Sequence, residues 1–239
     1  MRFVRHFTLI FSTLLVMLFG GTAAVASPAS PDSIVQRAPS AVSHDGVTCP
    51  TSDRDSSPTT APTNVEPYYL DDWRLGPKVL PKRGPIGTML KGYERLDDFP
   101  TAAQFLDCYW NDTIGGWWFP DQDGFALDDG EPVKRKVTLR PGQKLDLFGS
   151  GMGRFLAPAG TPYEKRALPP SNLDTYDPDY PLSYHLYEVA KPFTVDAGPI
   201  RPWFGQPGLG LQYVVNADYS PGAASIPSLV MQGYLRPLN

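Results

Sequence analysis

The sequence predicts an α+β protein that is mainly β, built on a small, loop-rich antiparallel sheet core with an N-terminal extension. Two observations predict this fold class. Short segments of alternating side chains are separated by turns rich in proline and glycine, of which the chain has 27 and 22, and this spacing is typical of antiparallel strands. Only one segment, residues 99–106, has the pattern of a short helix.

Residues 1–26 have the three parts of a secretory signal peptide. Arg2 and Arg5 form a basic start, an apolar run covers residues 7–19, and Ala24-Val25-Ala26 supplies a small-residue cleavage site. Cleavage removes two positive charges, so the formal net charge of −4 becomes −6. An acidic mature chain disfavours nucleic acid as a partner, and no later apolar stretch has the length of a membrane span. We therefore expect a secreted protein, extracellular or at the cell surface.

The segment 27–65 is predicted to be a disordered linker or pro-region. It consists mostly of Ser, Pro, Thr, Ala and Asp, and so few large apolar side chains cannot offset the entropy of ordering the chain. Cys49 lies in this segment, and an even pair of cysteines in an oxidising compartment predicts a disulfide with Cys108. Asn111-Asp112-Thr113 is a glycosylation sequon, so we expect a glycan on Asn111.

Residues 66–239 form the predicted domain, with an N-terminal subregion at 66–132 and a core at 133–239. Residues 66–90 have a loop-like composition, and the aromatic side chains that follow, Trp110 to Phe119, are expected to pack in a core. The acidic runs 121–124 and 128–131 lack the ligand spacing of a calcium-binding EF-hand loop, so we interpret them as solvated turns.

The core segment contains several predicted strands. They cover residues 133–139, 144–148, 184–189, 194–195, 211–215 and 229–235. The glycine-rich turn 149–153 lacks the lysine and the following helix of a phosphate-binding loop, so nucleotide binding of that type is not supported. Only His44 and His185 remain after processing and both cysteines are expected to be oxidised, so we expect no metal. From the residues alone, His185 is interpreted as a structural histidine within a strand.

The stretch 191–213 combines aromatic side chains with glycine and proline. Its glycines allow a tight turn and close backbone approach, after which Leu211 to Val215 alternates as a strand. Gln212 is then expected at the mouth of the strand, where it presents an amide to a flat ligand. Composition alone favours the other interpretation, a proline-rich loop that packs its own aromatic rings.

Two blocks of the sequence, LRPGQKLDLFGSGMGRFLAPAGTPYEKRALPPSNL and YHLYEVAKPFTVDAGPIRPWFGQPGLGLQY, resemble the tuberculosis necrotizing toxin domain family of NAD glycohydrolases. The resemblance covers about residues 75–239 and is greatest to the fungal secreted and surface members. It implies a core related in shape to ADP-ribosyltransferases, and residues 133–239 as the catalytic core. It also implies hydrolysis of the nicotinamide–ribose bond of NAD+, with no cofactor. NADP+ stays open as a second substrate.

The resemblance also implies site residues. Arg166 of the RALPP block and Gln212 of the G-x-G-x-Q-Y block match functionally critical positions, and His185 matches the histidine of Y-H-x-Y. Many bacterial members have an arginine where this chain has Leu147, so phosphate contact must come from elsewhere, for example from Arg154 or Arg166. The remaining expected substrate contacts are the rings of Phe155, Trp203, Phe204 and Tyr213.

Alternatives stay open beside this interpretation. One is an ADP-ribosyltransferase that modifies a protein, although no glutamate stands near Gln212 in the sequence. Another is a non-catalytic secreted module that binds a glycan through exposed aromatic rings. A homodimer also stays open. Fungal relatives can carry a C-terminal calcium segment, and we expect none here because no acidic cluster precedes Asn239.

Overall fold

The computed structural model describes residues 43–44, 47–49, 67–97, 99–221 and 225–239, all within one compact unit that covers Pro39–Asn239. The predicted signal peptide 1–26 lies outside the described residues, as does most of the predicted linker 27–65. Two short strands of that linker, β1 (Ser43–His44) and β2 (Val47–Thr48), pair antiparallel.

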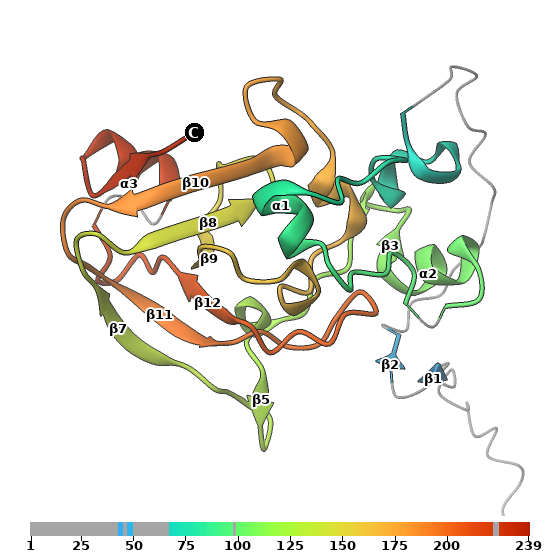
Figure 1. Ribbon diagram of the computed structural model, residues 1–239. Coiled ribbons are helices and arrows are strands. Elements are labelled where there is room, and N and C mark those ends of the chain that lie inside the picture. The colour runs from blue at the N-terminus through green and yellow to red at the C-terminus, as the bar shows by residue number, and fades with distance from the viewer. Residues whose placement is uncertain (1–42, 45–46, 50–66, 98, 222–224) are drawn as a thin grey trace, which may run out of the picture. The chain divides into compact units, whose positions relative to one another are not determined.

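A seven-stranded sheet forms the centre of the described chain, and every neighbouring pair in it is antiparallel. Figure 1 shows these strands side by side from β10 at the top to β7 at the bottom. Their order across the sheet is β13 (Leu235–Pro237), β10 (Tyr184–Val189), β8 (Lys144–Phe148), β9 (Phe155–Pro158), β12 (Leu211–Val214), β11 (Phe193–Pro199) and β7 (Arg135–Leu139). The prediction of a mainly-β, antiparallel core is confirmed.

The two faces of the sheet differ in character because side chains alternate along each strand. In β8, Leu145 and Leu147 lie in the main hydrophobic core, together with Leu156 of β9 and Tyr213 of β12. Asp146 points to the other face, since it falls between the two leucines. The helix α3 (Ile226–Met231) contributes Ile226 and Leu229 to this core, and Figure 1 shows the helix near one end of β10.

The prediction of a terminal strand at residues 229–235 was wrong over most of that range. Residues 226–231 form α3, and only Leu235 onward pairs with β10. Ser225 caps the helix by accepting a hydrogen bond from the backbone N–H of Ser228 at 3.4 Å, and a proline stands in its first turn. Both are start signals of a helix, and they outweighed the strand propensity of the apolar run that follows.

The N-terminal subregion packs on aromatic side chains. Its helices are α1 (Gly84–Met89), within the stretch that we expected to be loop, and α2 (Ala102–Tyr109), which begins after the N-cap Thr101 and so starts later than predicted. A second hydrophobic core lies here. It includes Leu75, Phe99, Phe105, Cys108, Tyr109 and Phe204.

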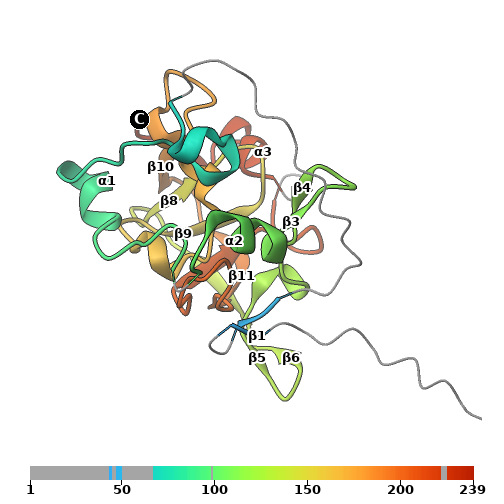
Figure 2. The same cartoon turned by 90° about the vertical axis from the view of Figure 1, so that its right-hand side faces the viewer.

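Short hairpins and turns complete the subregion. Figure 2 shows α2 beside the hairpin of β3 (Trp110–Asn111) and β4 (Gly116–Trp117), while the hairpin of β5 (Leu127–Asp128) and β6 (Glu131–Pro132) projects from the body. Single turns of 3-10 helix occur at Tyr69–Asp71, Trp73–Leu75, Gln122–Gly124, Tyr163–Lys165, Pro170–Leu173 and Pro181–Ser183. No helix in the described ranges is long and apolar enough to span a bilayer.

The cysteine prediction is confirmed, because Cys49 and Cys108 form a disulfide. Asn111, the expected glycan site, lies in β3, and its side-chain oxygen accepts a hydrogen bond from the N–H of Thr113 at 2.9 Å. Of the aromatic side chains expected in a core, Trp110 is buried, whereas Phe119 is 58% exposed. Phe119 therefore lies at the edge of the aromatic core, where its ring is 5.5 Å from the buried Phe204 ring.

Candidate active site

A cavity of about 470 Å³ opens at the end of the sheet where the turn Gly149–Gly153 joins β8 to β9. It is lined by Asp146 and Gln212 of the polar face and also by Leu147, Leu156 and Ile226 of the main core. Its lining includes both residues that the resemblance marks as critical, Arg166 and Gln212. Because one cavity holds both side chains, a single ligand can contact both.

Gln212 and Asp146 lie on the same face of the sheet, two strands apart, with Ala157 between them. Tyr213 pairs with Leu156, so the preceding Gln212 stands next to Ala157, and Ala157 in turn pairs with Asp146. These three side chains form a row across β12, β9 and β8 on one face, because directly opposite residues of paired strands share a face. The row explains how positions far apart in the sequence meet.

The amide of Gln212 is held by a neighbouring loop. Its Nε2 donates a hydrogen bond to the backbone oxygen of Asp123 at 3.0 Å, and the residue is buried. With the nitrogen engaged, Oε1 is the amide atom left to accept a hydrogen bond from a hydroxyl or a water. The site thus presents an acceptor of fixed orientation.

Arg166 forms a buried ion pair with Asp146, with 2.7 Å between Nη2 and Oδ1. Its Nε and Nη2 donate to the backbone oxygen of Thr161 at 3.0 and 2.8 Å, and its guanidinium lies 5.1 Å from the centroid of the Phe148 ring. Within the described chain these contacts leave Nη1 as the nitrogen available to a ligand oxygen. Arg166 is therefore pre-positioned rather than mobile.

Asp146 is fully buried and has further donors. Its Oδ2 accepts hydrogen bonds from the Gly160 N–H at 2.8 Å and from the Tyr184 hydroxyl at 3.1 Å. Burial raises the pKa of Asp146, and the charge of Arg166 together with these donors opposes the rise. Sequence reasoning did not single out Asp146. The alternation of KLDLF, which puts one acid between two core leucines, was the available signal.

Phe155 and Phe119 line the same cavity, and both rings are substantially exposed, 44% for Phe155 and 58% for Phe119. Phe155 was an expected substrate contact, whereas Phe119 was not. Arg154 does not line the cavity. It forms an ion pair with the Asp123 carboxylate, and its guanidinium lies 5.3 Å from the Phe155 ring centroid. Arg154 thus supports the wall next to Phe155.

The acidic run 121–124, which we interpreted as a solvated turn, forms one wall of the cavity through Asp123 and Gly124. Asp121 is exposed as expected, yet it pairs with Arg201, with 2.7 Å between Oδ1 and Nη1. Arg201 also lines the cavity and donates from Nε to the backbone oxygen of Phe125 at 3.2 Å. This loop therefore holds Gln212, Arg154 and Arg201 in place.

The structure does not bring three of the expected substrate contacts into this cavity. Phe204 is fully buried in the N-terminal aromatic core, with its ring 5.1 Å from that of Tyr109. Trp203 packs against the same core and donates from Nε1 to the Trp118 backbone oxygen at 2.7 Å. Tyr213 points to the opposite face of the sheet, into the main core. Each of these rings has a packing role in the fold.

His185 does not line this cavity; it lies on the core face of the sheet, where it pairs with Leu147 of β8. Its Nε2 lies 3.0 Å from the backbone oxygen of Gly149. A side chain at Gly151 would meet the imidazole at 2.9 Å, so packing against His185 requires glycine there. Across the described residues no group of three or more His, Cys, Asp or Glu side chains is suited to hold a metal.

The fold and the cavity define a mainly-β protein that presents a fixed guanidinium and a fixed amide to one ligand. The family described as tuberculosis necrotizing toxin matches residues 138–238. The chain is also 46% identical over 175 residues to the conidial surface nicotinamide adenine dinucleotide glycohydrolase nadA of Aspergillus fumigatus, covering 72% of this chain and 71% of that protein. This protein belongs to the tuberculosis necrotizing toxin family.

Two solved structures are similar to part of this chain. Tuberculosis necrotizing toxin in complex with its immunity factor is 20% identical, with a TM-score of 0.45 over 59% of this chain and 75% of that chain. Tse6 in complex with Tsi6 is 18% identical, with a TM-score of 0.29 over 47% of this chain and 76% of that chain.

Proposed function

We propose that this protein is an NAD+ glycohydrolase of the cell surface or the extracellular medium, which releases nicotinamide and ADP-ribose from NAD+. The relative that is 46% identical carries this activity and a surface location in its name. The observation that carries the proposal is the shared cavity of Arg166 and Gln212, because the family resemblance of the sequence marks the same two residues as functionally critical.

The chemistry of the reaction suits these residues. Nicotinamide leaves as a neutral molecule from a cationic ring, so its departure needs no strong acid, and the ribose passes through an oxocarbenium-like state. Water then bonds to the anomeric carbon and loses a proton. Catalysis of this kind rests on orientation and on fixed dipoles. In our proposal, Gln212 Oε1 orients the ribose hydroxyls or the attacking water, while Asp123 fixes the amide.

The pyrophosphate is proposed to lie against Arg166 and Arg201. Arg166 offers Nη1, since its other donors are engaged by Asp146 and Thr161. Arg201 forms an ion pair with the exposed carboxylate of Asp121, and its Nε and Nη2 donate to the backbone oxygens of Phe125 and Asp121 at 3.2 and 3.4 Å. Exposed ion pairs of this kind contribute little. A phosphate can therefore compete for this guanidinium, whose planar fork matches phosphate oxygens. Arg201 would then supply a phosphate contact that Leu147, which stands where many bacterial members have an arginine, does not supply.

The nicotinamide ring is proposed to stack on the exposed rings of Phe119 and Phe155. Both line the cavity, and an aromatic ring exposed at a cavity rim is suited to cover a planar ligand. These assignments replace Trp203 and Phe204, whose rings lie in the aromatic core. Nicotinamide would then leave toward solvent past two apolar side chains.

Other parts of the proposal concern processing and partners. A signal peptide at residues 1–26, a linker at 27–65, a catalytic domain at 66–239 and a glycan on Asn111 all fit a secreted protein. NADP+ remains a second candidate substrate.

Incubation of the purified protein with NAD+ tests the proposal. Chromatography should detect nicotinamide and free ADP-ribose in equal amounts. Nicotinamide release with ADP-ribose attached to protein would instead indicate a transferase. Intact NAD+ after prolonged incubation of folded protein would refute both enzyme assignments.

A further inference from the structure

One wall of the cavity comes from outside the segment that we expected to be the catalytic core. Residues 119–124 belong to the N-terminal subregion, and they line the cavity through Phe119, Pro120, Asp123 and Gly124. Gly198 of β11 makes room for the chain that follows this wall. Gly198 pairs with Gln212, and a Cβ at position 198 would lie 2.9 Å from the Phe125 ring. The wall is therefore held close to the sheet beside Gln212.

The backbone of this wall has an uncommon conformation next to Gln212. Gln122, Asp123 and Gly124 have φ values of 52°, 57° and 68° in succession, in the left-handed region that glycine adopts more readily than other residues. Such a conformation persists only where the surrounding structure holds it. A contact that holds Asp123 therefore also holds its backbone oxygen, which accepts the hydrogen bond from Gln212 Nε2 at 3.0 Å.

The contacts of Arg201 fix the residues on either side of Asp123. The Arg201 N–H donates to the backbone oxygen of Gly124 at 2.8 Å, and its guanidinium pairs with the Asp121 carboxylate at 2.7 Å. Between these two points, an ion pair with Arg154 anchors the Asp123 side chain. Arg154 is itself fixed, because its backbone oxygen accepts from the Val215 N–H at 2.9 Å, just beyond β12. Arg154 thus connects the wall to the strand that carries Gln212.

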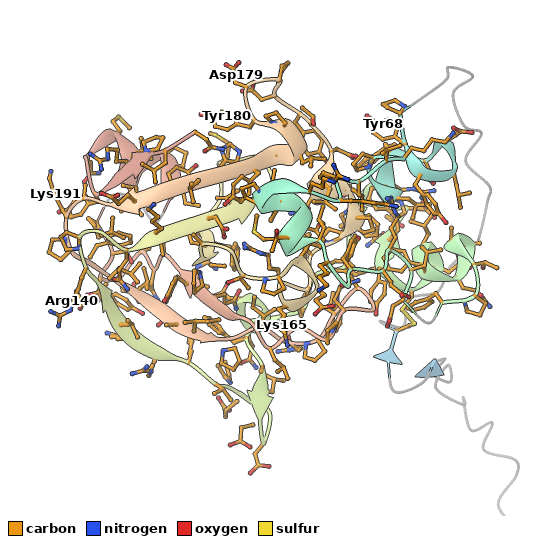
Figure 3. The ribbon with its side chains drawn as sticks, viewed as in Figure 1. Tyr68, Arg140, Lys165, Asp179, Tyr180 and Lys191 are labelled. Carbon is orange, nitrogen blue, oxygen red and sulfur yellow. A yellow bond between two sulfur atoms is a disulfide. The ribbon has the colours of Figure 1, made fainter. Side chains whose placement is uncertain are left out.

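The backbone of Gln212 is held independently of this wall. Gly210 donates its N–H to the backbone oxygen of Lys165 at 3.0 Å, and Figure 3 labels Lys165 beside the loop that leads into β12. Lys165 directly precedes Arg166, so this contact ties together the chain segments of both critical residues. Loss of the ion pair between Arg154 and Asp123 should therefore change the orientation of the Gln212 amide and leave its backbone in place.

We propose that Arg154 is a positioning residue for the reaction: it fixes Asp123, and the backbone oxygen of Asp123 fixes the amide of Gln212. The reaction itself rests on the proposed function. This role differs from the phosphate contact that the family resemblance suggested for Arg154, because the guanidinium pairs with Asp123 and Arg154 does not line the cavity. It also makes the N-terminal subregion a part of the active site.

The ion pair should matter more for the rate than for folding. The side chains of Arg154 and Asp123 are 38% and 26% exposed, and ion pairs with this much exposure contribute little to stability. An amide that can rotate, in contrast, no longer presents Oε1 in a fixed direction, and a misplacement of about 1 Å can lower a rate by about 100-fold. Kinetics and thermal unfolding together therefore separate a positioning role from a purely structural one.

Steady-state kinetics of Arg154→Ala test the inference. The kcat of nicotinamide release should fall about 10- to 100-fold, while the KM for NAD+ and the melting temperature stay close to those of wild type. Arg154→Lys should keep most of the rate, because an ammonium group can still pair with Asp123. Arg236→Ala is the matched control, since Arg236 also forms an exposed ion pair, with Glu188 at 2.7 Å, and does not line the cavity.

A double variant tests whether Arg154 acts through Asp123. Asp123→Asn removes the charge, and asparagine tolerates the left-handed conformation. Arg154→Ala combined with Asp123→Asn should cost no more in kcat than Arg154→Ala alone, because both changes break one contact. Losses that simply multiply would mean that the two residues act separately, which would contradict the inference.

The orientation of the amide can also be observed without turnover. In isotope-labelled protein, the side-chain amide resonances of Gln212 can be assigned from their loss in Gln212→Ala. In Arg154→Ala these resonances should move toward those of a freely rotating glutamine side chain, whereas Arg236→Ala should leave them unchanged.

Two results would overturn the inference. A kcat in Arg154→Ala equal to that of wild type, with or without a raised KM, would mean that Arg154 does not position a group for the chemical step. Unchanged Gln212 resonances in Arg154→Ala would mean that the amide is held without the ion pair. Wild-type protein that leaves NAD+ intact would instead refute the proposed function, and the resonances would still decide whether Arg154 positions the amide.

Discussion

Asp146 and Arg166 form a buried ion pair, 2.7 Å apart, on the face of the sheet that also carries Gln212. Asp146 comes from a strand of the sheet, whereas Arg166 follows the 3-10 turn Tyr163–Lys165. The pair therefore ties the irregular segment after β9 to the sheet. Breaking this ion pair should therefore affect both the stability of the fold and ligand binding, and the two effects can be measured separately.

Asp146→Leu should destabilise the fold by about 3 kcal/mol, because removing one partner leaves the other charge buried and unpaired. The double variant Asp146→Leu, Arg166→Met should recover most of this loss, since an apolar pair of similar volume needs no compensation. Neither variant should hydrolyse NAD+. Urea unfolding and nicotinamide release measure the two effects. A double variant as unstable as the single one, or one that retains activity, would contradict this assignment.

The rings of Phe119 and Phe155 should contribute more to binding than to folding, although the Phe119 ring also lies edge to face on the buried Phe204 ring, at 5.5 Å. Phe119→Ala and Phe155→Ala should each raise the KM for NAD+ about tenfold, as for the loss of one stacking contact, with little change in melting temperature. Steady-state kinetics and thermal unfolding check this. Leu127→Ala, at an exposed position outside the cavity, is the control. A KM that stays at the wild-type value in both variants would show that nicotinamide lies elsewhere.

Asp174 should make stability depend on pH. Burial raises its pKa to about 7, against the opposing charge of Arg95, and within the described residues neither carboxylate oxygen has a hydrogen-bond partner. The unfolded chain releases this proton near pH 3.8. Between these two pH values the folded state binds more protons than the unfolded state. The stabilisation that protonated Asp174 contributes is therefore fully present below about pH 4 and is lost as the pH rises to about 7.

The free energy of unfolding should therefore fall by up to about 3 kcal/mol over this range because of Asp174. Asp174→Asn should remove that component of the pH dependence. Urea unfolding of both proteins at several pH values measures it. Parallel curves for wild type and variant across this range would mean that Asp174 ionises normally in the folded state.

The disulfide should matter for stability and not for catalysis. Cys49 and Cys108 are separated by 59 positions, and closing a loop of this size stabilises a fold by about 4 kcal/mol at most. Neither cysteine lines the cavity. Cys49→Ala, Cys108→Ala protein should unfold at lower urea concentration yet release nicotinamide at the wild-type rate when folded. Loss of activity in folded double variant would point to an unrecognised coupling.

Much of the sheet could be predicted because local alternation encodes it. The segments KLDLF and YHLYEV form β8 and β10 within the expected bounds, and burial alternates along the whole of β10. Apolar and polar residues do not alternate regularly in the run LVMQGYL. Because Ser225 provides a helix cap shortly before this run, residues 226–231 form a helix. Strand propensity alone did not indicate that the helix cap would determine the structure of this segment.

The walls of the site could not be predicted in the same way. Gln212 was expected at a ligand, but its partner Asp123 lies 89 positions earlier, and no local pattern links the two. Phe204 shared its sequence surroundings with Gln212, yet it packs into the N-terminal aromatic core. Sequence proximity in the stretch 191–213 was therefore a poor guide to which rings face a ligand.

The most direct test of the account is the rate of nicotinamide release by Gln212→Ala, measured beside the melting temperature. Gln206→Ala is the matched control, since Gln206 is also buried and donates to the backbone oxygen of Glu94 at 3.0 Å, outside the cavity. We predict at least a 100-fold fall in the rate for Gln212→Ala. Its melting temperature should fall by about 4 °C or less, and Gln206→Ala should stay active. A folded Gln212→Ala protein with near wild-type activity would contradict the central claim.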